Sequence, residues 1–203
     1  MSREPAKPLT FVICSVLEAE VRLLVSLKWP QAEIVALDSI LHIHPQELAD
    51  SLERAVSKEL AEGRRVVLVY GDCFARMDEL EKRRGVVRVA GINCTASVLG
   101  KEHYRRLVRE GAFFLLPEWT ERWHMVFSEE LGLSPENAQS LMCEMHRKLV
   151  YLDTGVVPVP LITLQACSEY CGLPYEILPV KLDPLRGCIE DAINRLSLET
   201  TTV

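Results

Sequence analysis

Three cysteines that follow directly on apolar segments are the strongest candidates for chemistry in this sequence. Cys14 ends the run LTFVIC, Cys73 follows VVLVYGD and Cys94 follows VVRVAGIN. Each cysteine also precedes or opens an expected helix, where unpaired backbone N–H groups favour a thiolate over a thiol. Thiolates select soft or borderline metals over magnesium or calcium. We therefore expect Cys14, Cys73 and Cys94 to bind zinc or a similar thiophilic metal.

A carboxylate on an apolar helix face is the second candidate. Glu20 has helical spacing with Leu24 and Leu27, so it lies on the apolar stripe of an expected helix, one turn after the first of the three cysteines. Because a buried carboxylate needs a partner, Glu20 is the predicted catalytic residue. Ser15 and Glu18 have the spacing of a capping box, and we assign them the structural role of starting that helix.

Packing is the alternative explanation for all of these cysteines. Cysteine is among the most buried residue types, and a small apolar side chain suits a tight turn from strand to helix. The same alternative is stronger for pairs that merely share a helix face, and a solvated edge best explains two histidines that alternate along one segment. These weaker pairs are Cys143 with His146, Cys167 with Cys171, and His42 with His44.

The elements that must position these residues alternate between strand and helix. Short runs rich in Val, Ile and Leu predict strands at Leu9–Cys14, Ile34–Leu37, Arg65–Tyr70, Val86–Val89, Ala112–Leu116, Leu149–Leu152 and, as an edge, Tyr175–Val180. Segments with helical period lie between them, among them Val16–Leu27, Gln46–Glu62, Lys101–Arg109 and Ser134–Arg147. Parallel strands need such crossover helices.

The predicted fold is therefore α/β, a single domain over residues 1–203 with an open, mostly parallel sheet and helices on both faces, Rossmann-like or flavodoxin-like. In the flavodoxin-like order 2-1-3-4-5, the first, third and fourth strands are neighbours. Ligands bind such sheets at the carboxyl ends of the strands. This order would bring the three thiols to one edge of the sheet.

Composition excludes several classes of function. The 203 residues carry 23 Lys and Arg against 29 Asp and Glu, a net charge of -6, so nucleic acid is not an expected partner. The sequence shows no membrane span and no signal peptide, which predicts a cytoplasmic protein, with residues 1–8 and 198–203 as flexible termini. Seven cysteines in that reducing compartment favour free thiols or metal ligands over a disulfide framework.

The segments FVICSVLEAEV, VYGDC, INCTASVLGKEHY, FFLLPEW and YLDTG carry a resemblance to a known family. Together they resemble the uncharacterised family catalogued as domain of unknown function 1638. The family pattern falls on Cys14, Glu18, Glu20, Tyr70, Gly71, Cys73, Cys94, Leu99, Gly100, Pro117 and Trp119. Phe74 stands where a second glycine often follows the cysteine, and Asn93 where an aspartate often precedes the other cysteine.

The resemblance implies a site and a metabolic setting. It implies a cofactor-binding role for Tyr70, Gly71, Leu99, Gly100 and Trp119 beside the cysteines. Family members commonly occur beside corrinoid-dependent methylamine methyltransferases, an association that implies a corrinoid cofactor, a corrinoid protein or methyltransferase partner, and a small-molecule thiol or methyl donor.

Three functions are compatible with these observations. The first is a zinc-dependent enzyme of methyl or thiol transfer, with a fourth metal position for Glu20, water or a substrate thiol. The second is a non-catalytic carrier or accessory protein that holds a metal or corrinoid for a methyltransferase. The third is a binding domain whose cysteines lie only in the core.

Overall fold

The computed structural model describes residues 7–199 and has two compact units. Unit 1 comprises the chain up to Cys94 together with the chain from Leu185 onward. Unit 2 is Thr95–Pro184. Within the described residues, no helix is both long enough and apolar enough to cross a membrane.

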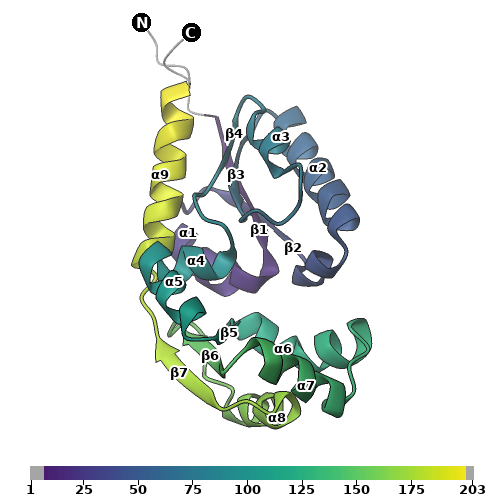
Figure 1. Cartoon of the computed structure of the whole chain (residues 1–203). Coiled ribbons are helices and arrows are strands. Elements are labelled where there is room, and N and C mark those ends of the chain that lie inside the picture. The colour runs from purple at the N-terminus through teal and green to yellow at the C-terminus, as the bar shows by residue number, and fades with distance from the viewer. Residues whose placement is uncertain (1–6, 200–203) are drawn as a thin grey trace, which may run out of the picture. The chain divides into compact units, whose positions relative to one another are not determined.

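Unit 1 is built on a four-stranded parallel sheet of order β2-β1-β3-β4 (Figure 1). This order matches the first four strands of the predicted flavodoxin-like order, and β1 is as predicted from the sequence. The strands are β1 Leu9–Cys14, β2 Glu33–Leu37, β3 Arg65–Val69 and β4 Val86–Arg88. Strand β1 lies in the centre of the sheet with five successive buried residues, as a strand covered on both faces requires.

Helices cover both faces of this sheet, and the direction of each crossover explains which face. The connection from β1 to β2 runs one way along the sheet, whereas those from β2 to β3 and from β3 to β4 run the other way. Right-handed crossovers therefore place α1 on one face and α2 and α3 on the other, as Figure 1 shows, with α9 beside α1. The helices are α1 Glu18–Lys28, α2 Pro45–Ala61, α3 Met77–Glu81 and α9 Asp183–Glu199.

The core of unit 1 contains one buried polar network. Thr10 on β1 donates a hydrogen bond of 2.8 Å from its hydroxyl to the carboxylate of Glu59 on α2. The guanidinium of Arg64 forms an ion pair with Glu59, with its Nε 3.6 Å from the carboxylate oxygen that accepts the hydrogen bond from Thr10. The buried carboxylate is thereby both hydrogen-bonded and charge-compensated, which its burial demands.

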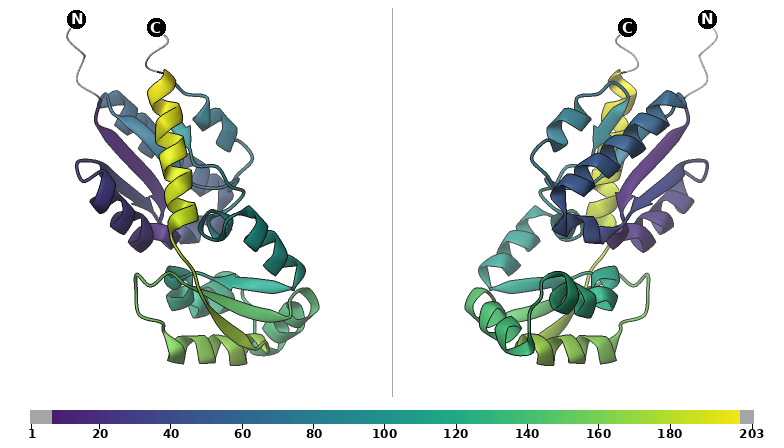
Figure 2. Two further views of the ribbon diagram at one scale, coloured as in Figure 1. Left: turned by 90° about the vertical axis from the view of Figure 1, so that its left-hand side faces the viewer. Right: turned by 90° about the vertical axis from the view of Figure 1, so that its right-hand side faces the viewer.

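Unit 2 contains a second parallel sheet, of order β5-β6-β7. Because both crossovers run in the same direction, α6, α7 and α8 cover one face, visible in Figure 2. Phe114 on β5 stacks on Tyr104 of α5, whereas its neighbour Phe113 packs against Phe127, as alternation along a strand requires. The elements are α4 Cys94–Leu99, α5 Lys101–Arg109, β5 Ala112–Leu115, α6 Pro117–His124, η3 Met125–Glu130, α7 Pro135–Met145, β6 Lys148–Asp153, α8 Leu161–Cys171 and β7 Tyr175–Pro179.

The α/β class, the parallel strands and the helices on the sheet faces are confirmed. The seven strands of residues 7–199 form two sheets, however, where the sequence favours one. Strand β5 pairs with β6 instead of joining β4. Hydrophobic periodicity in a sequence predicts the position of a strand but not the strand with which it pairs. The periodicity of β5 therefore could not show that this strand leaves the sheet of β1 to β4.

One local prediction, the capping box at Ser15, is wrong. Helix α1 begins at Glu18 without a side-chain cap, because Ser15–Leu17 form a short 3-10 turn (η1) first. The Ser15 hydroxyl instead accepts a hydrogen bond of 2.8 Å from the backbone N–H of Ser39. Helix α9 includes residues 198 and 199, and the flexibility expected of the two termini stays a prediction; residues 1–6 and 200–203 of that prediction lie outside the described residues.

Candidate functional site

Cys14 is the last residue of the central strand β1, at the carboxyl edge of the unit 1 sheet. Its side chain is 1% exposed. The backbone N–H of Val16 in the following turn donates a hydrogen bond to its sulfur, an interaction that lowers the pKa of the thiol. A central parallel strand that ends in a helical turn thus presents Cys14 at the position where open α/β sheets bind ligands.

A close backbone approach at Gly71 brings the Cys73 loop against the segment before Cys94. The backbone N–H of Asp72 donates a hydrogen bond of 2.9 Å to the carbonyl of Ile92. A Cβ atom at Gly71 would lie 2.4 Å from that carbonyl oxygen and 2.5 Å from the Cα of the next residue, Asn93. Only glycine leaves room for this contact. The loops after β3 and β4 are therefore fastened together across the sheet edge.

His42 is the functional residue that the sequence interpretation missed. It lies on η2 (Ser39–Ile43), a 3-10 helix after β2, and not on the strand-like solvated edge that its alternation with His44 suggested. Asp38 caps this helix by accepting from the N–H of Ile40 at 2.9 Å. The principle that ligands bind at the carboxyl ends of parallel strands could have identified His42. Strand β2 is the direct neighbour of β1, and His42 closely follows the carboxyl end of β2.

The hydrogen bond from Ser39 to the Ser15 hydroxyl fastens η2 beside the end of β1. His42 Nδ1 lies 3.0 Å from the carbonyl oxygen of Ser39 and 3.9 Å from the sulfur of Cys14. A carbonyl oxygen can only accept, so Nδ1 carries the hydrogen. This arrangement leaves Nε2 as the nitrogen that would bind a metal, as in many metal-ligating histidines.

The three predicted cysteines and His42 form a chain of contacts. The order along the chain is Cys94, Cys14, His42 and Cys73: the sulfur of Cys14 lies 3.9 Å from Nδ1 of His42, and side-chain interactions that shift their pKa values link Cys94 to Cys14 and Cys73 to His42. Cys14 and Cys94 are buried, and Cys73 is partly exposed. All four residues lie at or closely follow the carboxyl ends of the strands of one sheet.

The contacts give the site a charge-separated electrostatic character. The hydrogen bond from Cys94 lowers the pKa of Cys14, whereas burial raises it. Interactions with His42 lower this pKa further, to about 6. Burial lowers the pKa of His42, but hydrogen bonds with Cys14 and Cys73 outweigh burial and raise it to about 10. The hydrogen bond between Cys94 and Cys14 raises the pKa of the Cys94 thiol, and burial raises it further. Near neutral pH the metal-free site therefore pairs a thiolate at Cys14 with an imidazolium at His42.

Tyr70 closes the buried side of the site. Its ring stacks on the imidazole of His42, with the ring centroids 6.4 Å apart and an interplanar angle of 16°. Burial raises the pKa of the Tyr70 phenol, and so do charges at Cys14, Cys94 and Cys73. The hydroxyl therefore remains protonated and can donate a hydrogen bond.

Glu20 is buried on α1, with 1% of its surface exposed, and it has an interaction partner. Its burial agrees with the apolar stripe on which the sequence placed it. Its catalytic role stays a prediction. Tyr70 and Gly71 lie in unit 1 with the cysteines, whereas Leu99, Gly100 and Trp119 belong to unit 2.

The other cysteines differ in their surroundings. Cys167 and Cys171 are fully buried in the core of unit 2, as the packing explanation predicts. Cys143 is exposed, so the packing explanation is wrong for it. It faces solvent at the end of α7, with its sulfur 3.5 Å from the carbonyl of Gly172.

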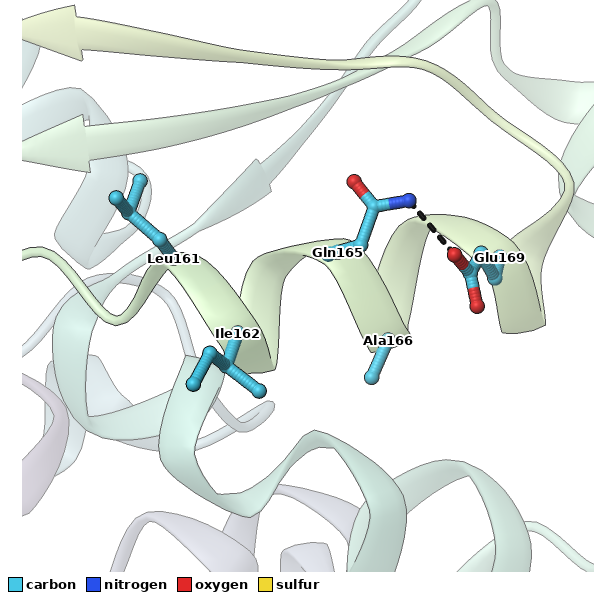
Figure 3. Close-up of a pocket in the computed structure, with 5 residues that line it drawn as sticks. All are labelled: Leu161, Ile162, Gln165, Ala166 and Glu169. Atoms are coloured by element: carbon cyan, nitrogen blue, oxygen red, sulfur yellow. Dashed lines mark hydrogen bonds between the residues drawn. The ribbon is translucent and has the colours of Figure 1, made fainter.

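Unit 2 also has an open surface hollow along α8 (Figure 3). Leu161, Ile162, Gln165, Ala166 and Glu169 line it. The amide of Gln165 donates a hydrogen bond of 2.7 Å to the Glu169 carboxylate, so the polar groups of the hollow pair with each other. All five of these lining residues belong to one helix, and among them is neither a cysteine, a serine nor a histidine.

The thiol and imidazole groups fit a thiophilic metal by their chemistry. Two thiolates on one tetrahedral zinc lie about 3.8 Å apart, given Zn–S bonds of about 2.3 Å. The four side chains contact one another in succession and do not enclose a metal position. Within residues 7–199, no three His, Cys, Asp or Glu side chains form a metal site. Single side chains would have to rotate to complete the metal site.

Comparison with known proteins identifies a family but no characterised relative. No curated protein matches the sequence. The family model "Protein of unknown function (DUF1638)" matches residues 36–189, which include His42, Tyr70, Cys73 and Cys94. The match covers most of the sequence and confirms the resemblance. The chain therefore belongs to the DUF1638 family.

Proposed function

We propose that unit 1 binds a thiophilic metal, with zinc as the first choice, through Cys14, Cys73, Cys94 and His42. The observation that carries the proposal is the chain of contacts among three thiols and one imidazole at four strand ends of one sheet. Three sulfurs and one nitrogen are a donor set typical of zinc. The Ser39 carbonyl would orient the imidazole from behind.

The proposed reaction class is methyl or thiol transfer. A bound metal of this kind supplies Lewis acidity, which lowers the pKa of a thiol. The thiol substrate loses its proton to solvent, and its sulfur attacks the methyl carbon of a donor such as a methylated corrinoid. A C–S bond forms while the bond to the leaving group breaks, and the electron pair stays with the leaving group.

A carrier protein that delivers the metal or a corrinoid to a methyltransferase is the non-catalytic form of the same proposal.

The test is elemental analysis of anaerobically purified protein. We expect about one zinc per chain in the wild type, because one ligand set is proposed, and its loss in Cys73→Ser and His42→Ala. Cys143→Ser is the matched control, because that thiol is exposed in unit 2 and should be irrelevant to metal content. Zinc retained by both site variants would overturn the proposal.

Glu20→Gln separates a catalytic from a ligating role for that carboxylate. The zinc content of this variant should equal that of the wild type, because the thiols and the imidazole make up the ligand set. Loss of zinc without loss of secondary structure by circular dichroism would instead place Glu20 among the ligands.

A redox thiol pair is the second candidate, favoured by the direct contact between Cys14 and Cys94. Peroxide would take two electrons and two protons from the pair, forming one S–S bond and two molecules of water. Titration of metal-free protein with hydrogen peroxide, followed by mass spectrometry of the peptides, tests this alternative. A Cys14–Cys94 disulfide in a protein that binds no zinc would favour it over the metal site.

A further inference from the structure

The hydroxyl of Tyr70 is buried without a hydrogen-bond partner. Within the described residues, only Arg65 and His103 also have a side-chain polar atom of this kind. An unsatisfied buried polar group destabilises the native state, so such a group in a native protein requires an explanation. Phenylalanine would fill the same volume without this cost.

The position of Tyr70 suggests what the hydroxyl is for. The residue is 1% exposed, so its hydroxyl has no access to bulk water. Its ring is stacked on His42, and its phenol interacts electrostatically with all three cysteines of the site. The next residue, Gly71, is held against Ile92 by the close backbone approach, so the chain around Tyr70 has little freedom to move.

We propose that the Tyr70 hydroxyl donates a hydrogen bond to the sulfur of a small thiol that binds at the cysteine–histidine site as a thiolate. This inference rests on the proposed metal function. A thiophilic metal selects sulfur among incoming ligands, and an ionised acceptor makes the stronger hydrogen bond with a phenol. The thiol would give its proton to solvent and bind as a thiolate beside the residues that would hold the metal, whose Lewis acidity would stabilise the thiolate.

The ligand enters from the partly exposed side of the site. Cys73 and His42 have intermediate exposure, whereas Cys14, Cys94 and Tyr70 are buried. A small thiol that enters beside Cys73 therefore reaches the buried phenol only after passing the metal ligands. Tyr70 acts as a positioning residue for the substrate, and the metal ligands do not depend on it.

The test uses protein loaded with Co²⁺ and titrated with 2-mercaptoethanol, followed by the thiolate-to-cobalt charge-transfer absorption. Wild type, Tyr70→Phe and the control Tyr175→Phe in unit 2 should bind equal amounts of cobalt. The Kd for 2-mercaptoethanol should rise about tenfold or more in Tyr70→Phe alone, the effect of losing one hydrogen bond to an ionised acceptor.

The outcomes separate this inference from the proposed function. Equal Kd values in wild type and Tyr70→Phe, both loaded with cobalt, would overturn the role of Tyr70 and leave the metal site intact. Loss of cobalt by Tyr70→Phe would also overturn it, because the hydroxyl would then serve the metal ligands. A wild type that takes up no cobalt would overturn both proposals.

Discussion

Substitution of Gly71 by alanine tests whether the backbone approach between two loops builds the site. The added Cβ would lie 2.4 Å from the carbonyl oxygen of Ile92, and 2.5 and 2.6 Å from the Cα and N of Asn93. All three are backbone atoms, so no flexible side chain can yield. The two loops must separate, and the hydrogen bond from Asp72 to Ile92 must lengthen or break.

Overpacking of this kind costs about 1–3 kcal/mol, and we expect Gly71→Ala to lower the free energy of unfolding by that amount. Gly187 in helix α9 provides the matched control, because its added Cβ would meet nothing within 4 Å. Gly187→Ala should stabilise the protein by about 0.5–1 kcal/mol, since alanine is the better helix former.

Urea denaturation of the metal-free proteins measures both effects, and zinc titration then measures the site. We expect Gly71→Ala to weaken zinc binding as well, because Cys73 and Cys94 lie on the two separated loops. Equal stability of the two variants, with unchanged zinc affinity in Gly71→Ala, would refute the argument that this contact assembles the site.

Two further predictions concern charge and burial in unit 1. The difference in ultraviolet thiolate absorbance between metal-free wild type and Cys14→Ser should appear as pH rises through about 6, because hydrogen bonds from Cys94 and then His42 lower the pKa of Cys14. His42→Ala should move this midpoint upward, and a wild-type midpoint at the ordinary thiol value of 9.0 would contradict the described contacts. Thr10→Val should lower the free energy of unfolding by about 1–3 kcal/mol, because the buried carboxylate of Glu59 loses a donor. Unchanged urea denaturation of this variant would show that the carboxylate finds another partner.

Much of the fold follows from local pattern, whereas strand pairing does not. Runs such as Leu9–Cys14 and Arg65–Val69 are continuous and β-branched because both faces of the sheet are covered, and this signal is local. The departure of β5 to a second sheet depends on contacts between β5 and β6, which are far apart in sequence. No periodicity within β5 distinguishes the two arrangements.

The site was predictable to the same degree. Cys14, Cys73 and Cys94 could be found because each follows a recognisable strand, and parallel strands end at one edge. His42 was missed because its segment looked like a strand, whereas Ser15 and Ser39 hold it in a helical turn beside Cys14. That hydrogen bond joins two loops, so the sequence could show only a capping motif at Ser15.

X-ray absorption at the zinc edge of zinc-loaded protein tests the central claim most directly, because it identifies the atoms bound to the metal. The proposed ligands predict three sulfur atoms at about 2.3 Å and one nitrogen at about 2.0–2.1 Å. Cys73→Ser should reduce the sulfur count, whereas Cys143→Ser should leave the spectrum unchanged. A zinc shell of only nitrogen and oxygen atoms in the wild type, or a sulfur count unaffected by Cys73→Ser, would contradict the assignment of the site.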